Sequence, residues 1–179
     1  MREQAKFWQA PEFQQLELLR ATYVTHTFAS HIHETYVVGM VEDGLESFYC
    51  RGENHTAGKN QIVLINPGEI HTGQAAQRGG WWKQRAFYPP ASLMEQIASE
   101  ISGKREAAPF FTQPVVYDPE TADLIRRAHI AQECSASPLE RSSMVRLALA
   151  QVVARYAHHR PQSAKLHDEQ RSIRLAREY

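Results

Sequence analysis

The stretch SHIHETYVVGMV at residues 30–41, taken together with QIVLINPGEIH at residues 61–71, decides the fold of this chain. His31 and His33 stand two residues apart, directly before a near-continuous apolar run. His71 follows a second apolar run, which Asn-Pro-Gly stops. Because alternate residues of a strand point to the same face, His31 and His33 are expected to point the same way. We expect His71 to approach them from a neighbouring strand.

Short segments rich in β-forming residues extend on both sides of these histidines. Each is apolar or alternating and stops at a turn signal, and one such signal is Glu42-Asp43-Gly44. Short strands separated by turns at intervals of about ten residues are typical of a sandwich or barrel. We therefore expect residues 16–90 to form a barrel and residues 1–15 to form an arm before it. The expected strands are residues 16–20, 22–28, 35–41, 47–51, 61–65 and 81–88.

After residue 90 the spacing of the apolar residues becomes helical, which predicts a helix at residues 91–102. Residues 114–117 predict a further short strand. Asp118-Pro119 and Ser137-Pro138 predict the starts of two more helices, because Asp and Ser favour the N-cap and Pro suits the first helical position.

The last two helices would form an antiparallel hairpin, so residues 91–160 are predicted to be a helical and dimerisation part. The second helix of the hairpin carries an apolar stripe that packs either within the chain or against a second copy. Residues 161–179 are predicted to be a linker followed by the start of another helix, at residues 167–179. The stripe consists of Met144, Val145, Ala148, Leu149, Val152 and Tyr156.

Composition narrows the class of protein. The chain has 179 residues, 42% hydrophobic and 22% charged, which is typical of a globular protein. Lys and Arg balance Asp and Glu, so the formal net charge of zero gives no general attraction to nucleic acid. The two cysteines, Cys50 and Cys134, lack the spacing of a metal site. The sequence shows no signal peptide and no membrane-spanning apolar run, so we expect a cytoplasmic protein.

The order of these signals resembles a known family. The stretches SHIHETYVVGMVEDG, RGENHTAGKNQIVLINPGEIH and FYPP are similar to the N-terminal ligand-binding domain of AraC/XylS-family transcription regulators, over residues 16–160. The C-terminal HDEQRSIRLAREY resembles the linker and first helix leading to that family's DNA-binding domain. The resemblance implies a mainly β fold with α: a cupin barrel (double-stranded β-helix, or jelly roll) followed by an antiparallel helical hairpin used for homodimerisation. DNA would be bound only by a C-terminal pair of helix-turn-helix motifs, which is absent here.

The three histidines admit two interpretations. Cupin enzymes hold a divalent metal with His-x-His, a Glu a few residues later and a further His, so His31, His33 and His71 are candidate metal ligands. At the position of that Glu this chain has Val37 or Val38, and Glu34 should point to the opposite face. The alternative is that the histidines line a pocket without metal and hydrogen-bond a bound effector.

Other residues are candidates for contacting a ligand. In the strand at residues 81–88, one face carries Lys83 and Arg85, which would bind an anionic effector or an amino acid if they pointed inward. The opposite face offers an amide with aromatic residues. Tyr36 could also reach the pocket. In arabinose-responsive members of the family an arm folds over the ligand, so the resemblance implies Trp8 as a lid.

The sequence therefore predicts an effector-sensing and dimerising domain rather than an enzyme. It would bind a small molecule in the barrel without a required cofactor. Whether a divalent metal is also bound is left open by the sequence. The alternative function is a metal-dependent cupin enzyme, such as a dioxygenase or isomerase. A third interpretation is a stand-alone binding or storage module.

Overall fold

The computed structural model describes residues 2–162. The predicted helix at residues 167–179 lies outside the described residues, as does most of the linker before it. The predicted fold class is confirmed, because the chain forms an antiparallel β structure followed by helices. No helix in the described part of the chain is long and apolar enough to cross a membrane.

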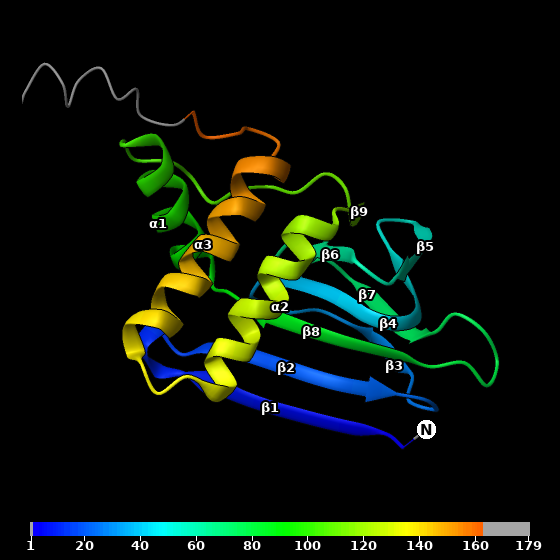
Figure 1. Ribbon diagram of the computed structural model, residues 1–179. Helices are drawn as coiled ribbons and strands as arrows, with labels where there is room; N and C mark the ends of the chain where they lie inside the picture. The colour runs from blue at the N-terminus through cyan, green and yellow to red at the C-terminus, as the bar shows by residue number, and fades with distance from the viewer. Residues whose placement is uncertain (1, 163–179) are drawn as a thin grey trace, which may run out of the picture.

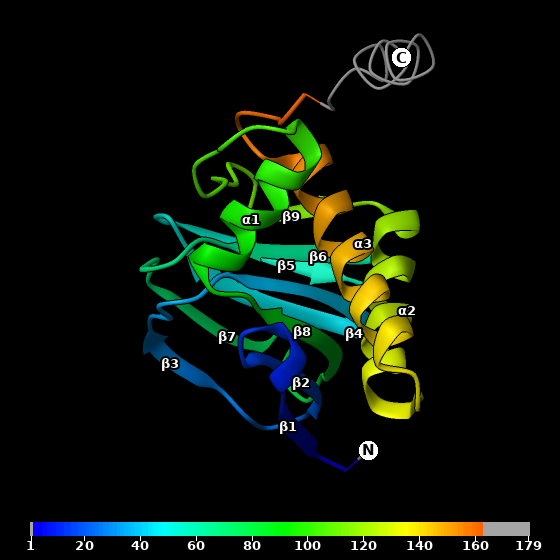
Figure 2. The same cartoon turned by 90° about the vertical axis from the view of Figure 1, so that its left-hand side faces the viewer.

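The β part consists of two sheets that share one long strand, β4 (Figures 1 and 2). The larger sheet has the order β1-β2-β8-β4-β6-β9. In the second sheet β3 pairs with β7, and both β7 and β5 pair with β4. All of these pairings are antiparallel. The strands are β1 (Gln4–Ala10), β2 (Leu16–Tyr23), β3 (Phe28–His31), β4 (Val37–Cys50), β5 (Glu53–Gly58), β6 (Gln61–Ile65), β7 (His71–Ala75), β8 (Trp82–Tyr88) and β9 (Val115–Tyr117).

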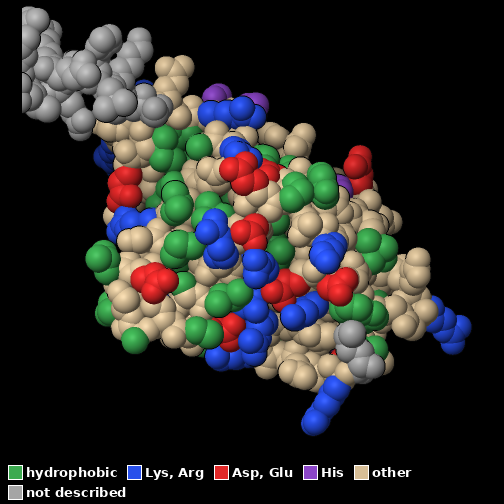
Figure 3. Space-filling model, viewed as in Figure 1, with side chains coloured by type: hydrophobic (Ala, Val, Ile, Leu, Met, Phe, Trp, Pro, Cys, Tyr) green, Lys and Arg blue, Asp and Glu red, His purple; other side chains and the backbone are tan. Residues whose placement is uncertain are grey.

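The helices cover one side of the larger sheet, and β3 and β7 lie on the other side (Figure 2). They are α1 (Ala91–Ser102), α2 (Pro119–Cys134) and α3 (Pro138–Tyr156). The predicted helix starts are confirmed: the Asp118 side chain accepts a hydrogen bond from the Thr121 amide, and the Ser137 side chain accepts one from the Glu140 amide. On the face shown in Figure 3, Lys and Arg side chains are interspersed with Asp and Glu side chains.

The apolar stripe of α3 packs within the same chain. Four of its members, Val145, Ala148, Leu149 and Val152, are completely buried in the core between the helices and the sheet. Met144 and Tyr156 pack against that core. Helical periodicity marks a packing face without showing what covers it. The prediction of a dimer interface along this stripe is therefore corrected: the residues form the interior of one chain.

Three predictions in the β part are also wrong. The predicted arm contains β1, which pairs along its whole length with β2 and extends the larger sheet. Glu42-Asp43-Gly44 does not end a strand, because β4 continues through it to Cys50. The register of β4 against β8 instead shifts between Val41 and Asp43, as at a β-bulge. The segment predicted as a strand at residues 22–28 is divided between the end of β2 and the start of β3.

Candidate functional site

A cavity lies inside the barrel between the two sheets. It has about 610 Å³ of empty space, counting the part that opens to solvent. Its wall is mostly apolar, with polar groups at a few positions, which is the usual character of a small-molecule site. Its lining includes Phe28, His31, His33, Val37, Met40, Glu46, Phe48, Val63, Ile65, His71, Gly73, Gln84, Ala86 and Tyr88.

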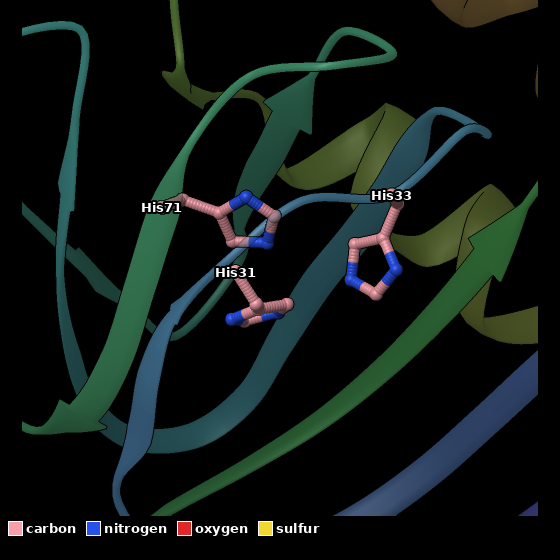
Figure 4. Close-up of side chains that lie close together, drawn as sticks. All are labelled: His31, His33 and His71. Carbon is pink, nitrogen blue, oxygen red and sulfur yellow. The ribbon is translucent and has the colours of Figure 1, made fainter.

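The three predicted histidines meet at this cavity (Figure 4). His31 ends β3, His33 follows in the loop, and His71 begins β7, which pairs with β3 so that His31 and His71 are direct partners. Their ring centroids are 4.3 Å apart, and that of His33 lies 4.9 Å from His31 and 5.2 Å from His71. One ring nitrogen from each of the three lies within 4.8 Å of the others. The strand pairing therefore produces the cluster that the sequence predicted.

Backbone contacts orient two of the rings. Nδ1 of His31 lies 2.8 Å from the Ala29 carbonyl oxygen, and Nδ1 of His71 lies 2.9 Å from that of Glu69. A carbonyl oxygen only accepts hydrogen bonds, so in each ring Nδ1 carries the proton and Nε2 keeps its lone pair. Holding an imidazole in this way is typical of metal-binding histidines, where the other nitrogen is the ligand.

Two of the three histidines, His33 and His71, have a lowered proton affinity. Burial, followed by the neighbouring His71 and His31, lowers the pKa of His33 to about 4. Burial is also the largest cause that lowers the pKa of His71. His33 and His71 are therefore neutral near neutral pH, and the neutral imidazole is the form that binds metal ions.

The donor set fits a borderline divalent metal held by three imidazoles, with positions left open for an exogenous ligand. The carboxylate of cupin enzymes is missing at the expected place, where Val37 lines the cavity and Val38 is buried in the core. Glu34 is exposed. Bound there, such an ion would supply Lewis-acid binding of an oxygen or nitrogen donor, and the backbone carbonyls beside His31 and His71 would keep their rings oriented.

Glu46 is a cavity residue that the sequence reading missed. It lies on β4, and only 8% of it is exposed. Its Oε2 atom has no hydrogen-bond partner among the described residues. Burial raises the pKa of this carboxyl from 4.5 to about 8. An isolated buried carboxyl is costly in a folded protein, so such a group often serves a binding or chemical role.

The signal for Glu46 was available in the strand alternation. Alternate residues of a strand share a face, and Glu46 is two residues before Phe48, which also lines the cavity. The predicted turn at Glu42-Asp43-Gly44 left Glu46 outside the strand expected at residues 47–51, so its place in this alternation was missed. A β-bulge changes which residues face which side, and the bulge near Val41 makes the second half of β4 turn Glu46 toward the cavity.

The two cations predicted as ligand contacts lie on the opposite side of β8. Nε of Arg85 lies 2.7 Å from Oε1 of Glu42, and its Nη1 lies 2.8 Å from Oε2 of Glu133 on α2. Lys83 pairs with Glu42 at 2.9 Å. The cavity is lined instead by the alternate residues Gln84, Ala86 and Tyr88. The prediction that Lys83 and Arg85 bind the ligand is therefore corrected, because protein carboxylates already neutralise both.

Tyr36 and Trp8 also lie away from the cavity wall. Tyr36 is buried in the core, and its hydroxyl donates a hydrogen bond to the Pro109 carbonyl at 2.6 Å. Trp8 on β1 packs edge-on against His129 of α2, with ring centroids 5.0 Å apart. Because β1 is tied into the sheet, Trp8 belongs to the sheet–helix contact. The predictions of Tyr36 as a pocket residue and Trp8 as a lid are both corrected.

Comparison with known families matches residues 13–169 to the family described as the AraC-like ligand binding domain. Among curated proteins, the chain is 22% identical over 142 residues to the uncharacterized HTH-type transcriptional regulator YbfI of Bacillus subtilis (strain 168). The match takes in 79% of this chain and 51% of that protein. The chain thus spans about half the length of the curated relative that it matches.

Two solved structures are similar to about half of this chain. A Cupin 2 conserved barrel domain protein from Leptotrichia buccalis has a TM-score of 0.43 and 15% identity, covering 49% of this chain and 41% of that one. An RmlC-like cupin family protein with a double-stranded β-helix fold, from Methanocaldococcus jannaschii, has a TM-score of 0.43 and 10% identity, covering 50% and 83%. Both are cupins by name.

Proposed function

The chain belongs to the family of AraC-like ligand-binding domains, and from this premise we propose that it senses a small effector molecule on behalf of a transcription regulator. The observation that carries the proposal is the cavity itself, in which His31, His33 and His71 converge beside an isolated carboxyl. The effector would bind there and shift the protein between conformations by binding one of them more tightly.

The rest of the proposal concerns partners. DNA would be bound by a helix-turn-helix part of the whole protein, as the name of the Bacillus relative suggests. We propose a cytoplasmic homodimer, with contacts other than the buried stripe of α3. The formal net charge of zero supports a division of labour in which this part binds the effector and another part binds DNA.

A second candidate function is supported by one observation. The oriented Nε2 atoms of His31 and His71 suit a divalent metal, which would support a metal-dependent cupin enzyme such as a dioxygenase or isomerase. The absent cupin carboxylate weighs against catalysis. We therefore place the histidines in effector recognition, either directly or through a metal that the effector also contacts.

The test of this function begins with metal content. The chain is purified without chelator, its metal is measured by elemental analysis, and binding of Zn²⁺ is titrated in wild type and His71→Ala. If the histidines form the site, His71→Ala should weaken Zn²⁺ binding more than about 100-fold, because it removes one of three ligands. The control is His158→Ala, since His158 is exposed and away from the cavity. Equal Zn²⁺ affinity in both variants would remove His71 from the site.

A further inference from the structure

We propose that Glu46 binds a cationic nitrogen group of the effector, so that the cavity selects small amines with an apolar body. The inference rests on the proposed function, because it takes the cavity as the effector site. It names the class of effector, which neither the family nor the histidine cluster specifies.

The first step of the argument is the isolation of this carboxyl. Glu46 is 8% exposed, lines the cavity, and has an Oε2 atom without a partner among the described residues. A buried polar group left without a hydrogen bond costs about 1–3 kcal/mol, and more when it is charged. In the protein alone no hydrogen bond to Oε2 offsets that cost within the described residues. A ligand that donates hydrogen bonds to this carboxyl would offset it.

The second step is that the protein supplies no cation of its own. No Lys or Arg lines the cavity in the described part of the chain, since Lys83 and Arg85 face the helix side and pair with Glu42. The titratable groups that share the cavity with Glu46 are Tyr88, His31, His33 and His71. Outside the cavity lining, burial, followed by the charges of Glu46 and Glu3, raises the pKa of Tyr23.

The third step concerns shape and the remaining wall. Gly73 carries no side chain beside Glu46, and a Cβ placed there would lie 3.5 Å from its Oε1 atom. Apolar side chains enclose the rest of the space, and two of them, Phe28 and Phe48, are aromatic. A protonated amine would pair with Glu46, while an apolar body would fill the space between these walls. The low dielectric of such a site strengthens a charge-assisted hydrogen bond.

The experiment uses three probes of similar shape and different charge: benzylamine, benzyl alcohol and benzoate. Their affinities for the 179-residue chain are measured by calorimetry, and nuclear magnetic resonance places them in the cavity. The titrations are run above the Glu46 pKa of about 8, where this carboxyl is ionised. We expect benzylamine to bind about tenfold or more tightly than benzyl alcohol, and benzoate to bind most weakly, because only the amine forms an ion pair with Glu46.

The variant Glu46→Gln keeps the shape of the side chain and removes its charge. It should abolish the preference for benzylamine over benzyl alcohol while the alcohol still binds. The matched control is Glu53→Gln, which makes the same change at an exposed position on β5 and should keep the preference. Circular dichroism of both variants checks that they fold.

The outcomes separate this inference from the proposed function. Binding of the alcohol or benzoate as tightly as the amine would overturn the role of Glu46 and leave the cavity standing as a ligand site. Failure of all three probes would also overturn the amine assignment, while the Zn²⁺ titration of His71→Ala still tests the histidine site. A preference for the amine that survives Glu46→Gln would assign the selectivity to other residues.

Discussion

Glu42 and Glu46 lie four residues apart on the same strand, and they face opposite surroundings. Glu42 faces α2: burial tends to raise its pKa, but hydrogen bonds from Arg85 and Lys83 together outweigh burial and lower it. Glu46 faces the cavity, where burial acts unopposed and raises its pKa to about 8. One carboxyl is neutralised by partners that the protein supplies, and the other is left for a partner from outside. Burial alone therefore does not distinguish a structural charge from a binding charge.

The difference has a local cause in the backbone. Residues four apart on a regular strand share a face, so Glu42 and Glu46 should point the same way. The register shift near Val41 breaks this alternation and turns the two halves of β4 to different sides. Gly44, with φ of 78°, lies just after this shift and pairs with Trp82 of β8. The irregularity thus separates the ion pairs of the helix layer from the carboxyl of the cavity.

The largest effect on this comparison is expected when Arg85, the buried cation that contacts Glu42, is removed. Arg85→Met would leave Glu42 and Glu133 buried without the charge that they share, and breaking a buried pair costs about 3–5 kcal/mol. The free energy of unfolding, measured with urea, should fall by that amount.

A matched control removes the other cation that contacts Glu42. The Lys83 side chain is 42% exposed, so its ion pair with Glu42 is screened by water. Lys83→Met should therefore change the free energy of unfolding by only about 0–1 kcal/mol. Equal losses in the two variants would show that burial does not set the strength of this network.

The second variant, Gly44→Ala, disturbs the backbone near the register shift between β4 and β8. A side chain at Gly44 would overlap the backbone of Trp81 and would need a positive φ. Gly44→Ala should therefore lower the free energy of unfolding by about 2–3 kcal/mol. Gly52 also has a positive φ, but apart from its chain neighbours no atom of residues 2–162 lies within 4 Å of where its Cβ would be. Gly52→Ala is thus the control for strain without overlap, and it should cost less in the same urea titration.

The third variant tests Glu46 through the pH dependence of the free energy of unfolding. Because folding raises the pKa of Glu46 from 4.5 to about 8, the folded state binds a proton more tightly than the unfolded state. The stabilisation is fully present below pH 4.5 and is lost as the pH rises through 8. Between pH 6 and 8 it should fall by about 2 kcal/mol.

The measurement compares wild type with Glu46→Gln by urea unfolding at several pH values. Glutamine does not titrate, so the variant should lack this loss, and the difference between the two curves isolates Glu46 from the histidines. Parallel curves would show that Glu46 titrates near its ordinary value and is therefore solvated.

The parts of the fold that local sequence determines were predicted well. Asp118 and Ser137 marked helix starts because capping is decided within one turn, and α1 begins and ends at the predicted residues. His31, His33 and His71 were predicted to meet because apolar runs and alternation place them on paired strands. These signals need only a few neighbouring residues to be read.

The errors share a different origin. Whether Gly44 ends a strand or sits beside a bulge depends on the pairing of β4 with β8, far away in the sequence. The direction of Arg85 depends on Glu133, which arrives on α2. The covering of the α3 stripe depends on the whole layer of helices. Periodicity identifies the faces of an element, but tertiary contacts decide which face meets which partner.

The alternation of β8 has a practical consequence for engineering. Gln84, Ala86 and Tyr88 touch the cavity, whereas Arg85 between them holds the ion pairs with α2. A mutant library that varies the cavity-facing positions and keeps Arg85 would therefore explore new ligand preferences without removing the buried ion pairs. Phe48 and Val63 offer further such positions on β4 and β6. The barrel is thus laid out as a starting point for biosensors, with the variable and the fixed residues on opposite sides of one strand.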